Sequence, residues 1–454
     1  MDNTHDLFRP IILAAGSGSR MNSNTPKPLH KICGKEMLNM ILESCELANL
    51  ATAITIVPEK FDNFKTATKY KTEYIAQKQA KGSGDALSLI SQSEIPDNII
   101  VLNGDIPLIK NSTLTKLMEH HIESNAPITL LTAIPPDNNG LGRILRNSEN
   151  KILSIIEEND TDNKTRHIKE INVGVYCFKS SWLMKSMGNL RPSRKGEIYL
   201  TDLINIASNQ NNPINSVTLD DYTEGLGVND RAQLAKLEKL VRTQINNELL
   251  LNGVTIIDPD TSYIDQDIKI SKDTIIYPNT HIKEGTVIGD NCVIGPDSTI
   301  KGSNIGQNCV IASSTIEYSK IHNKVHIGPY SHIRKDSILE ENVRIGNYCE
   351  IKNSHIGKNS KSGHFSYLGD SIIGENVNIG AGTITCNYDG KNKNKTIIGD
   401  NAFIGSNTML VAPIKIGANS ITGTSSIITK DIPENAKAIG SPARIFKGDQ
   451  SKQT

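Results

Sequence analysis

The chain has 454 residues, with 49 Lys and Arg against 49 Asp and Glu, so its formal net charge is zero. This balance removes any global electrostatic argument for binding nucleic acid or an anionic membrane surface. The length suggests two or three domains. Aromatic residues make up only 4% of the chain, with one tryptophan, which favours a stacked solenoid of small aliphatic residues over one globular core.

The sequence offers no membrane or export signal. No run of about 18 apolar residues occurs, so we expect no membrane insertion. The first residues, MDNTHDLFRPIILAAG, lack the basic start of a signal peptide and are typical of the beginning of a strand. Seven cysteines are scattered without a CxxC pair. This pattern predicts reduced thiols in a cytoplasmic protein rather than a disulfide framework or a zinc site.

Before residue 250, strand-like runs alternate with helix-like runs, which is typical of βαβ units in a mostly parallel sheet. The predicted strands are Arg9–Ala15, Ile54–Val57, Asn98–Leu102, Ile128–Ala133 and Val173–Phe178, and one predicted helix is Met37–Ala48. The longest helical pattern, Asp230–Leu251, is followed by the helix stop Asn252-Gly253. We expect this helix to connect two domains.

After residue 250 the hydrophobic period changes to six residues. The step is occupied at Ile264, Ile270, Ile276, Ile282, Ile288, Ile294, Ile300, Ile321, Ile327, Ile333, Ile345, Ile351, Ile373, Ile379, Ile398, Ile404, Leu410 and Ile416. Helix and strand periods of about 3.6 and 2 do not explain it. A coil of three short strands does, with one apolar residue per strand pointing inward. Glycine often follows the isoleucine, and we expect it to let the chain turn each corner.

This ladder predicts a parallel β-helix. Its hand does not follow from the period, because crossovers between parallel strands are normally right-handed. The hexapeptide pattern resembles that of the left-handed β-helix acyltransferases, and this resemblance implies the left-handed form.

A glycine-rich turn follows the first predicted strand, in Leu13–Met21 (LAAGSGSRM). Glycines at this place let backbone N–H groups close around phosphates. Two cations follow, Arg20 and Lys27, the latter in the run PKPL. Taken alone, the GxG run also fits a tight strand-to-helix turn without a ligand.

A second polar motif, Asn103-Gly104-Asp105, follows another predicted strand. Doubly wound sheets bind their ligands at such strand ends. A carboxylate there is a natural Mg²⁺ ligand. Taken alone, Asp105 fits a turn or a helix N-cap better.

Together these motifs resemble the signature of the sugar-nucleotide pyrophosphorylases, with Ser19 where that family usually has Thr. Gln77 and the run Lys81–Ala86 resemble the loop that holds the uracil base, with Lys81 and Ser83 in place of the usual Leu and Thr. The resemblance implies an α/β Rossmann-like nucleotidyltransferase domain. It implies a UTP and UDP-N-acetylglucosamine site at Leu13, Ala14, Ala15, Gly16, Lys27, Gln77, Gly82, Ser83, Asn103, Gly104, Asp105, Gly142, Glu157, Asn172 and Asn229, with Mg²⁺ on Asp105 and Asn229.

The implied reaction needs no covalent nucleophile. An oxygen of the sugar 1-phosphate attacks the α-phosphate of UTP in line, and pyrophosphate leaves. The protein positions the groups and neutralises charge, as in phosphoryl transfer generally. Arg20, Lys27 and Mg²⁺ are expected to do so.

The isoleucine ladder breaks twice, between Ile356 and Ile373 and between Ile379 and Ile398. Insertions in a solenoid usually form loops that carry function. The breaks contain Lys361–Asp370 (KSGHFSYLGD) and Gly380–Gly390 (GAGTITCNYDG). These segments resemble blocks of the bacterial bifunctional N-acetylglucosamine-1-phosphate uridylyltransferase/glucosamine-1-phosphate acetyltransferase family, and the resemblance covers nearly the whole chain.

By this resemblance, His364 is the general base of acetyl transfer, a role suited to imidazole. Glucosamine 1-phosphate is expected at Arg334, Lys352, Tyr367 and Asn378. Acetyl-CoA is expected at Ala381, Asn387, Tyr388, Ser406, Thr424 and Arg444, with Thr424 where the family usually has Ala. Considered by themselves, His364 also fits a loop histidine with a structural hydrogen bond, and the two cations fit solvated surface charges.

The resemblance implies a bifunctional enzyme of UDP-N-acetylglucosamine biosynthesis with acetyl-CoA and UTP as co-substrates, acting as a homotrimer. We expect a pyrophosphorylase domain at residues 1–229, a helical linker at 230–252 and a left-handed β-helix acetyltransferase domain at 253–454. Two alternatives remain open: a pyrophosphorylase whose β-helix only regulates or oligomerises, and a trimeric scaffold without enzymatic activity.

Overall fold

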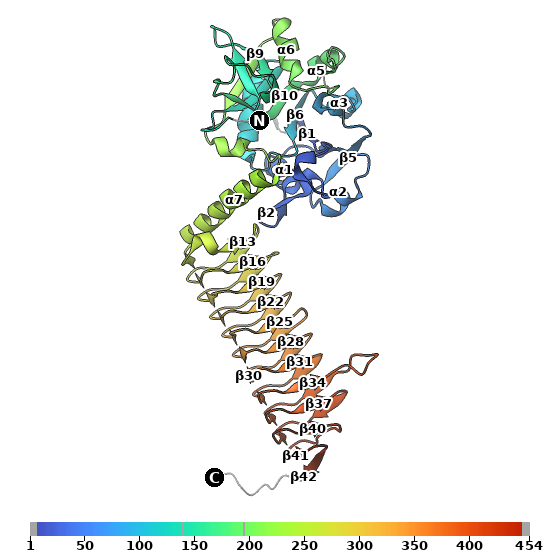
Figure 1. The fold of residues 1–454 in the computed structure, drawn as a ribbon, viewed down its shortest axis with the longest axis vertical. Helices are drawn as coiled ribbons and strands as arrows, with labels where there is room; N and C mark the ends of the chain where they lie inside the picture. The colour runs from blue at the N-terminus through green and yellow to red at the C-terminus, as the bar shows by residue number, and fades with distance from the viewer. Residues whose placement is uncertain (1–6, 139, 194–195, 447–454) are drawn as a thin grey trace. The chain divides into compact units, whose positions relative to one another are not determined.

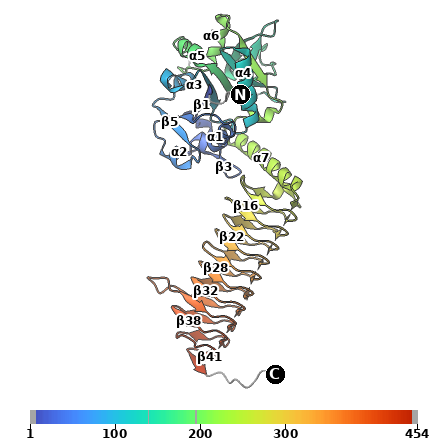
Figure 2. The ribbon, with the colours of Figure 1, turned by 180° about the vertical axis from the view of Figure 1, so that it is seen from behind.

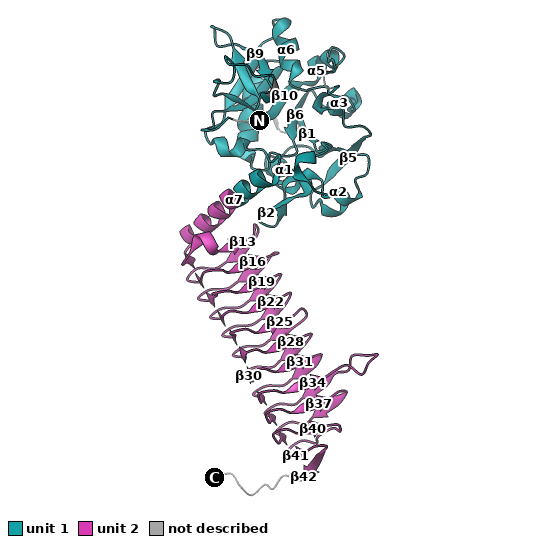
Figure 3. Ribbon diagram, viewed as in Figure 1, with its two compact units in different colours: residues 1–238 teal, residues 239–454 magenta. Residues whose placement is uncertain are grey.

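A computed structural model describes residues 7–138, 140–193 and 196–446. The chain divides into two compact units, residues 1–238 and 239–454, and the boundary lies within helix α7 (Arg231–Leu251) (Figure 3). The predicted helix over 230–251 is therefore present. Each unit is described by itself below. Among the described residues, no helix is long and apolar enough to cross a membrane.

The first unit is built on a mixed sheet with the strand order β11-β7-β10-β6-β1-β4-β5. These strands are β1 Phe8–Leu13, β4 Ala53–Pro58, β5 Thr72–Gln77, β6 Asn98–Asn103, β7 Ile128–Ala133, β10 Ile171–Lys179 and β11 Ile214–Thr218. Strand β1 pairs in parallel with β4 and β6, whereas β10 runs antiparallel to both β6 and β7. Along this strand order the expected parallel pairing is confirmed, except at β10, which is antiparallel to its neighbours.

A hairpin of β8 (Arg143–Arg146) and β9 (Ile152–Ile156) extends this sheet beside β10. Short strands β2 (Lys31–Ile32) and β3 (Lys35–Glu36) form a separate pair. The helices of the unit are α1 Met37–Leu47, α2 Asp62–Ala67, α3 Ser83–Leu87, α4 Asn111–Ser124, α5 Ser180–Met187 and α6 Asp202–Asn209.

Helices cover both faces of the sheet, as in doubly wound folds. On one face, Ile12 of β1 packs in a core with Ile41 of α1 and Leu117 of α4. On the other face, Ile11 of β1 packs in a second core with residues of α3, α5 and α6 such as Leu203. Consecutive residues of β1 enter opposite cores because side chains alternate along a strand.

The second unit is a parallel β-helix made of three sheets, whose coils stack one upon another in Figures 1 and 2. The first sheet contains β12 Thr255–Ile256, β15 Ile275–Ile276, β18 Val293–Ile294, β21 Val310–Ile311, β24 His326–Ile327, β27 Arg344–Asn347, β30 Lys361–His364, β33 Asn378–Ile379, β36 Phe403–Ile404, β39 Ile421–Thr422, β41 Lys437–Gly440 and β42 Ala443–Phe446. The second sheet contains β13 Tyr263–Ile264, β16 His281–Lys283, β19 Thr299–Lys301, β22 Thr315–Glu317, β25 His332–Ile333, β28 Glu350–Lys352, β31 Tyr367–Gly369, β34 Ile384–Cys386, β37 Met409–Val411 and β40 Ile427–Ile428. The third sheet contains β14 Lys269–Ile270, β17 Val287–Ile288, β20 Asn304–Ile305, β23 Lys320–Ile321, β26 Ile338–Leu339, β29 His355–Ile356, β32 Ser371–Ile373, β35 Thr396–Ile398 and β38 Ile414–Ile416.

The isoleucine ladder forms the core of this β-helix, as predicted. Its members are all buried, and they belong to one continuous apolar cluster. Register explains the stacking, because Ile282 pairs with Ile300 in the next coil of the second sheet. Each coil therefore repeats the same inward position and satisfies its backbone by parallel pairing with its neighbours.

The expected role of the glycines that follow these isoleucines is wrong for many of them. Gly289 does not take a positive φ; the corner is made by Asn291 with a φ of 56°. A Cβ on Gly289 would lie 2.9 Å from the backbone carbonyl carbon of Gly306 in the next coil. These glycines allow close stacking of coils, and Asn or Asp, which tolerate the left-handed region, turn the chain. Gly295, with a φ of 96°, is one that does take a positive value.

Candidate functional site

In the first unit, the sheet topology brings the separate sequence motifs to one edge. Leu13, the last residue of β1, pairs with Asn103, the last residue of β6. The glycine-rich turn and Asp105 therefore leave neighbouring parallel strands at the same edge. The nucleotide-site residues predicted from the sequence line two adjoining pockets there.

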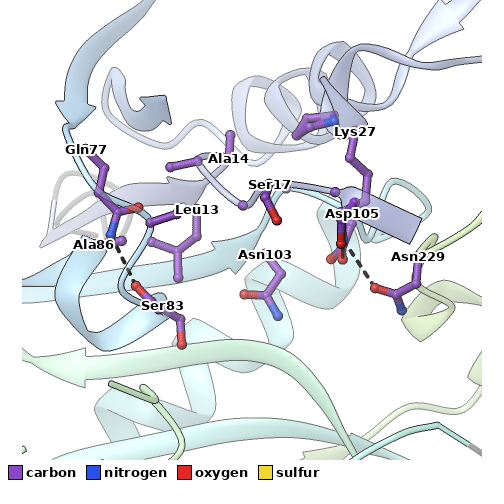
Figure 4. A pocket seen from close by; sticks show the side chains of 18 of the residues that line it. Leu13, Ala14, Ser17, Lys27, Gln77, Ser83, Ala86, Asn103, Asp105 and Asn229 are labelled. Carbon is purple, nitrogen blue, oxygen red and sulfur yellow. Dashed lines mark hydrogen bonds and ion pairs between the residues drawn. The ribbon is translucent and has the colours of Figure 1, made fainter. Parts of the chain in front are cut away.

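The first pocket is lined by Leu13, Ala14, Ala15, Gly16, Arg20, Lys27, Gln77, Gly82, Ser83, Asn103, Gly104, Asp105 and Asn229, among others. Gln77 and Ser83 lie on one side, and Lys27, Asp105 and Asn229 lie on the other (Figure 4). The second pocket is lined by Gly142, Glu157 and Asn172, and it shares Arg20, Ser83, Asn103, Asp105 and Asn229 with the first.

Cations and oxygen ligands meet at one end of the first pocket. The Lys27 ammonium forms an ion pair with the Asp105 carboxylate, and its Nζ lies 3.3 Å from Asn229 Oδ1. An Arg20 guanidinium N–H donates to the same Asn229 oxygen over 3.0 Å. The arrangement can neutralise a polyphosphate, and it also presents a carboxylate and an amide oxygen to a cation.

The opposite end of this pocket is a rigid loop. Gly82 has a φ of 108° and packs so closely on Ile198 that a Cβ would collide with its backbone. Ser83 Oγ accepts a hydrogen bond from the Leu200 backbone N–H over 3.0 Å. Gln77, at the end of β5, is only 6% exposed. The loop is therefore held by the segment Ile198–Leu200 on one side and by Gln77, whose Nε2 donates to the Gly82 carbonyl over 3.3 Å, on the other.

The β8–β9 hairpin sets the geometry of the second pocket. It places Gly142, before β8, beside Glu157, after β9, because Arg143 pairs with Ile156. Asn172 joins them, since its backbone N–H donates to the Gly142 carbonyl over 2.9 Å. Desolvation in the pocket raises the pKa of the Glu157 carboxyl. A hydrogen bond of 3.2 Å, donated by Thr201 Oγ1, lowers this pKa but does not cancel the effect of desolvation. This hairpin brings together residues from three separate sequence motifs.

Sequence reasoning missed several pocket residues: Tyr199, Thr201, Gly225 and Gly227 line the second pocket. Tyr199 and Thr201 stand in the segment 197–201, which no sequence motif marked and which the Ile198 N–H fixes on the Lys81 carbonyl over 2.7 Å. Gly225 and Gly227 stand in the run GLGVND, which also contains the predicted residue Asn229, so the sequence did offer a signal for these two glycines.

In the second unit, Arg334, Lys352 and Tyr367 lie on consecutive coils of the second sheet. Arg334 follows β25, Lys352 ends β28 and Tyr367 begins β31. The register places Arg334 beside Lys352, whereas Tyr367 pairs with Glu350, two residues before Lys352. The three side chains alternate with buried Ile333, Ile351 and Leu368, so they share the outward face of the second sheet as one polar column. Arg334 forms an ion pair of 2.7 Å with Glu350, a partner that the motifs did not indicate.

The loop 387–395 follows β34 and projects from the stacked coils (Figure 1). Its first residue, Asn387, is buried and donates from Nδ2 to Asp370 Oδ2 over 2.5 Å and to the Tyr367 hydroxyl over 3.4 Å. The ammonium of Lys352 close to Lys393 lowers the pKa of Lys393. Two adjacent cations suit a phosphate dianion. Lys393, which sequence reasoning missed, stands in the run KNKNK of the second ladder break.

The predicted base of acetyl transfer and several residues predicted for acetyl-CoA lie at the ends of strands of the first sheet. His364 ends β30, and its Nδ1 lies 3.1 Å from Asn347 Oδ1 of the previous coil. The positions after β33, β36 and β39 are stacked by backbone hydrogen bonds, from Asn407 N to the Ala381 carbonyl and from Ser425 N to the Ser406 carbonyl. This column consists of His364, Ala381, Ser406 and Thr424.

The remaining predicted residues lie at other places in the unit. Asn378 begins β33 on the first sheet, away from the cations of the second sheet. Tyr388 is exposed in the loop 387–395, and its hydroxyl donates to the Gly390 carbonyl over 2.7 Å. Arg444 lies in β42, which is antiparallel to β41. Within one chain, His364 and Tyr367 flank the corner between the two sheets, and the other predicted residues divide between these sheets and the loop.

Comparison with known proteins gives matches to three family models. Residues 9–230 match the nucleotidyl transferase model, residues 267–302 the bacterial transferase hexapeptide model, and residues 315–422 the GMPPB C-terminal domain model. The first covers the unit with the two pockets, and the other two fall in the left-handed β-helix.

Close relatives match over nearly the full chain. A protein of Thermosipho africanus (strain TCF52B) called "Bifunctional protein GlmU" is 46% identical over 445 residues, which is 97% of this chain and 96% of that protein. Proteins with the same name are 41% identical in Carboxydothermus hydrogenoformans, over 97% of this chain and 99% of the relative, and 40% identical in Streptococcus uberis, over 98% and 97%.

Proposed function

Because the chain belongs to the family of bifunctional GlmU proteins, it is an enzyme of UDP-N-acetylglucosamine biosynthesis, and we propose that its two units carry the two reactions. Residues 253–454 acetylate glucosamine 1-phosphate with acetyl-CoA. Residues 1–229 then transfer the uridylyl group of UTP to N-acetylglucosamine 1-phosphate, and residues 230–252 link them. The observation that carries this proposal is that one chain of this family contains both the two adjoining pockets of the first unit and the cations and histidine of the second, Arg334, Lys352 and His364.

Uridylyl transfer requires charge neutralisation at the first pocket. A phosphate oxygen of the sugar phosphate attacks the α-phosphorus of UTP, and the bond to pyrophosphate breaks. Lys27 and Arg20 stand at the end of the pocket that holds Asp105 and Asn229. Their positive charge can stabilise the extra negative charge of the transition state, while the backbone around Gly16 binds the phosphates.

A magnesium site at Asp105 and Asn229 fits the residues present. The carboxylate and the amide oxygen are hard ligands, and the Lys27 ammonium already contacts both, so the place attracts a cation. Mg²⁺ usually keeps water and phosphate oxygens as its other ligands, so two protein ligands suffice. When bound, it would neutralise phosphate charge; the protein residues hold and orient the reactants.

Acetyl transfer requires a base beside the attacking amine. If His364 Nδ1–H donates to Asn347 Oδ1, then Nε2 keeps its lone pair and can accept the amine proton. The amine nitrogen forms a bond to the thioester carbonyl carbon, the carbon–sulfur bond breaks, and the coenzyme leaves as its thiol. Arg334, Lys352 and Lys393 would hold the phosphate, with Tyr367 and Asn378 on the sugar. Ala381, Asn387, Tyr388, Ser406, Thr424 and Arg444 would line the coenzyme side.

The direct test of both activities uses the wild-type chain. Acetyl-CoA with glucosamine 1-phosphate should release thiol, and UTP with N-acetylglucosamine 1-phosphate should release pyrophosphate. EDTA should stop pyrophosphate release, and added Mg²⁺ should restore it, while thiol release continues. Absence of thiol release would favour a pyrophosphorylase whose β-helix is only structural.

We further propose a homotrimer in which neighbouring copies complete each acetyltransferase site. Support comes from the division of the predicted residues between two sheets: Lys352 lies on the second sheet, whereas His364 and Asn378 lie on the first. Facing sheets of two copies would bring the phosphate-binding cations of one chain toward the base of the next. A hexapeptide β-helix is consistent with this assembly.

Complementation between inactive variants tests this assembly. Lys352→Ala and His364→Ala, each inactive in thiol release alone, are co-expressed with different affinity tags and purified as mixed oligomers. If each site takes these residues from two copies, random mixing leaves about a quarter of the sites intact. Mixed oligomers that stay as inactive as either variant would place both residues of a site in one chain and contradict the proposal.

A further inference from the structure

We propose that Asp85 sets the base specificity of the nucleotide pocket by holding the side-chain amide of Gln77 in one orientation. This inference rests on the proposed function, in which Gln77 lies beside the base of the nucleotide. Asp85 lies in α3 (Ser83–Leu87), and Gln77 ends β5. Asp85 does not line the pocket, so it acts through Gln77 as a positioning residue.

The hydrogen bonds of Gln77 leave its amide one orientation. Its Nε2 donates to Asp85 Oδ2 over 2.7 Å and to the Gly82 backbone carbonyl over 3.3 Å. A carboxylate oxygen and a carbonyl oxygen carry no hydrogen and can only accept. The reversed amide would place Oε1 against two oxygens without a hydrogen between them. Because Gln77 is only 6% exposed, water cannot readily compensate for this repulsion.

This orientation changes what Gln77 can offer to a ligand. A free glutamine amide presents both a donor and an acceptor. Here both N–H groups are used by Asp85 and Gly82, so only Oε1 keeps free capacity for a ligand in the pocket that Gln77 lines. Gln77 is thereby converted into an acceptor.

An acceptor at this place discriminates between the two pyrimidines. N3 of uracil carries a hydrogen and can donate to Gln77 Oε1. N3 of cytosine carries a lone pair, so it would meet a second acceptor in a buried site, and one hydrogen bond would be replaced by repulsion. Sites that are built around one hydrogen-bond pattern reject a ligand with the opposite pattern strongly, because buried polar groups are left unpaired.

Substitutions at Asp85 test this role through nucleotide preference. We expect Asp85→Lys, which offers only donors, to turn Oε1 toward the lysine and Nε2 toward the base. The ratio of kcat/KM for UTP to that for CTP should then fall roughly 10- to 100-fold, with CTP turnover rising in absolute terms. Asp85→Asn, which keeps an acceptor oxygen, should retain the wild-type ratio. Asp62→Ala is the matched control, because the Asp62 side chain is fully exposed.

The outcomes separate this inference from the proposed function. Wild-type chain that releases no pyrophosphate from UTP would overturn the proposed function. Wild-type chain that uses UTP, with an unchanged UTP to CTP ratio in a folded and active Asp85→Lys variant, would overturn the role of Asp85 alone. If Asp85→Lys is inactive with both nucleotides, Asp85→Ala decides: a ratio lowered about tenfold supports the inference, and an unchanged ratio overturns it.

Discussion

Replacing Lys27 by alanine is expected to lower the rate of pyrophosphate release from UTP by roughly 10²-fold or more, the usual cost of losing a charge contact in a transition state. Lys27 is half-buried, and its ammonium contacts both Asp105 and Asn229 at the phosphate end of the first pocket. No other lysine lines this pocket in the described part of the chain. The measurement is a coupled pyrophosphate assay with UTP and N-acetylglucosamine 1-phosphate.

Two controls accompany the Lys27→Ala variant. Lys116→Ala removes a lysine whose side chain is 58% exposed and paired with Asp220 on the surface, and it should leave both activities unchanged. Thiol release by Lys27→Ala itself should also stay at the wild-type level, because Lys27 belongs to the first unit. Pyrophosphate release that remains normal in Lys27→Ala would refute the assignment of this pocket.

Replacing His364 by alanine is expected to lower thiol release from acetyl-CoA by roughly 10²- to 10⁴-fold, the range for loss of a general base. The side chain is exposed at the end of β30 and held from Nδ1 by Asn347, so a second ring nitrogen faces away from that bond. Thiol release is measured with glucosamine 1-phosphate as the acceptor. Pyrophosphate release by the same variant should not change.

The matched control for this variant is His355→Ala. His355 lies on the third sheet and pairs with Glu340 over 2.9 Å, outside both polar columns, so its loss should leave thiol release intact. A second variant, Asn347→Ala, should lower thiol release less than His364→Ala does, because it removes only the group that orients the ring. His364→Ala with wild-type thiol release would show that another group accepts the proton.

Sequence periodicity predicted the β-helix because the inward-facing positions of each coil recur at a short, fixed spacing in the sequence. Each coil places an aliphatic residue inward every six positions, and the same residue stacks on its counterpart, as Ile282 does on Ile300. The role of the glycines could not be predicted in this way. Gly289 is needed because the backbone of Gly306 lies against it, and these residues are in different coils.

Motifs also predicted most of the nucleotide pocket, because short runs that follow parallel strands must reach the same sheet edge. Glu157 joins this group only through the β8–β9 hairpin, which the hydrophobic pattern did not predict. Asn172 joins it through β10. The hydrophobic pattern also could not predict that β10 runs antiparallel to β6, because the direction of a strand depends on the path of the chain and not on the strand's own residues.

The sequence by itself determined the two kinds of repeat, the chemical groups available and their order, since composition and spacing are properties of neighbouring residues. Only the tertiary structure decided which of these groups act on one another. Lys393 stands beside Lys352, Asn387 beside Asp370, and Asp85 behind Gln77. Such pairs are chosen by how strands and coils pack, and packing energy depends on residues that are distant in the chain.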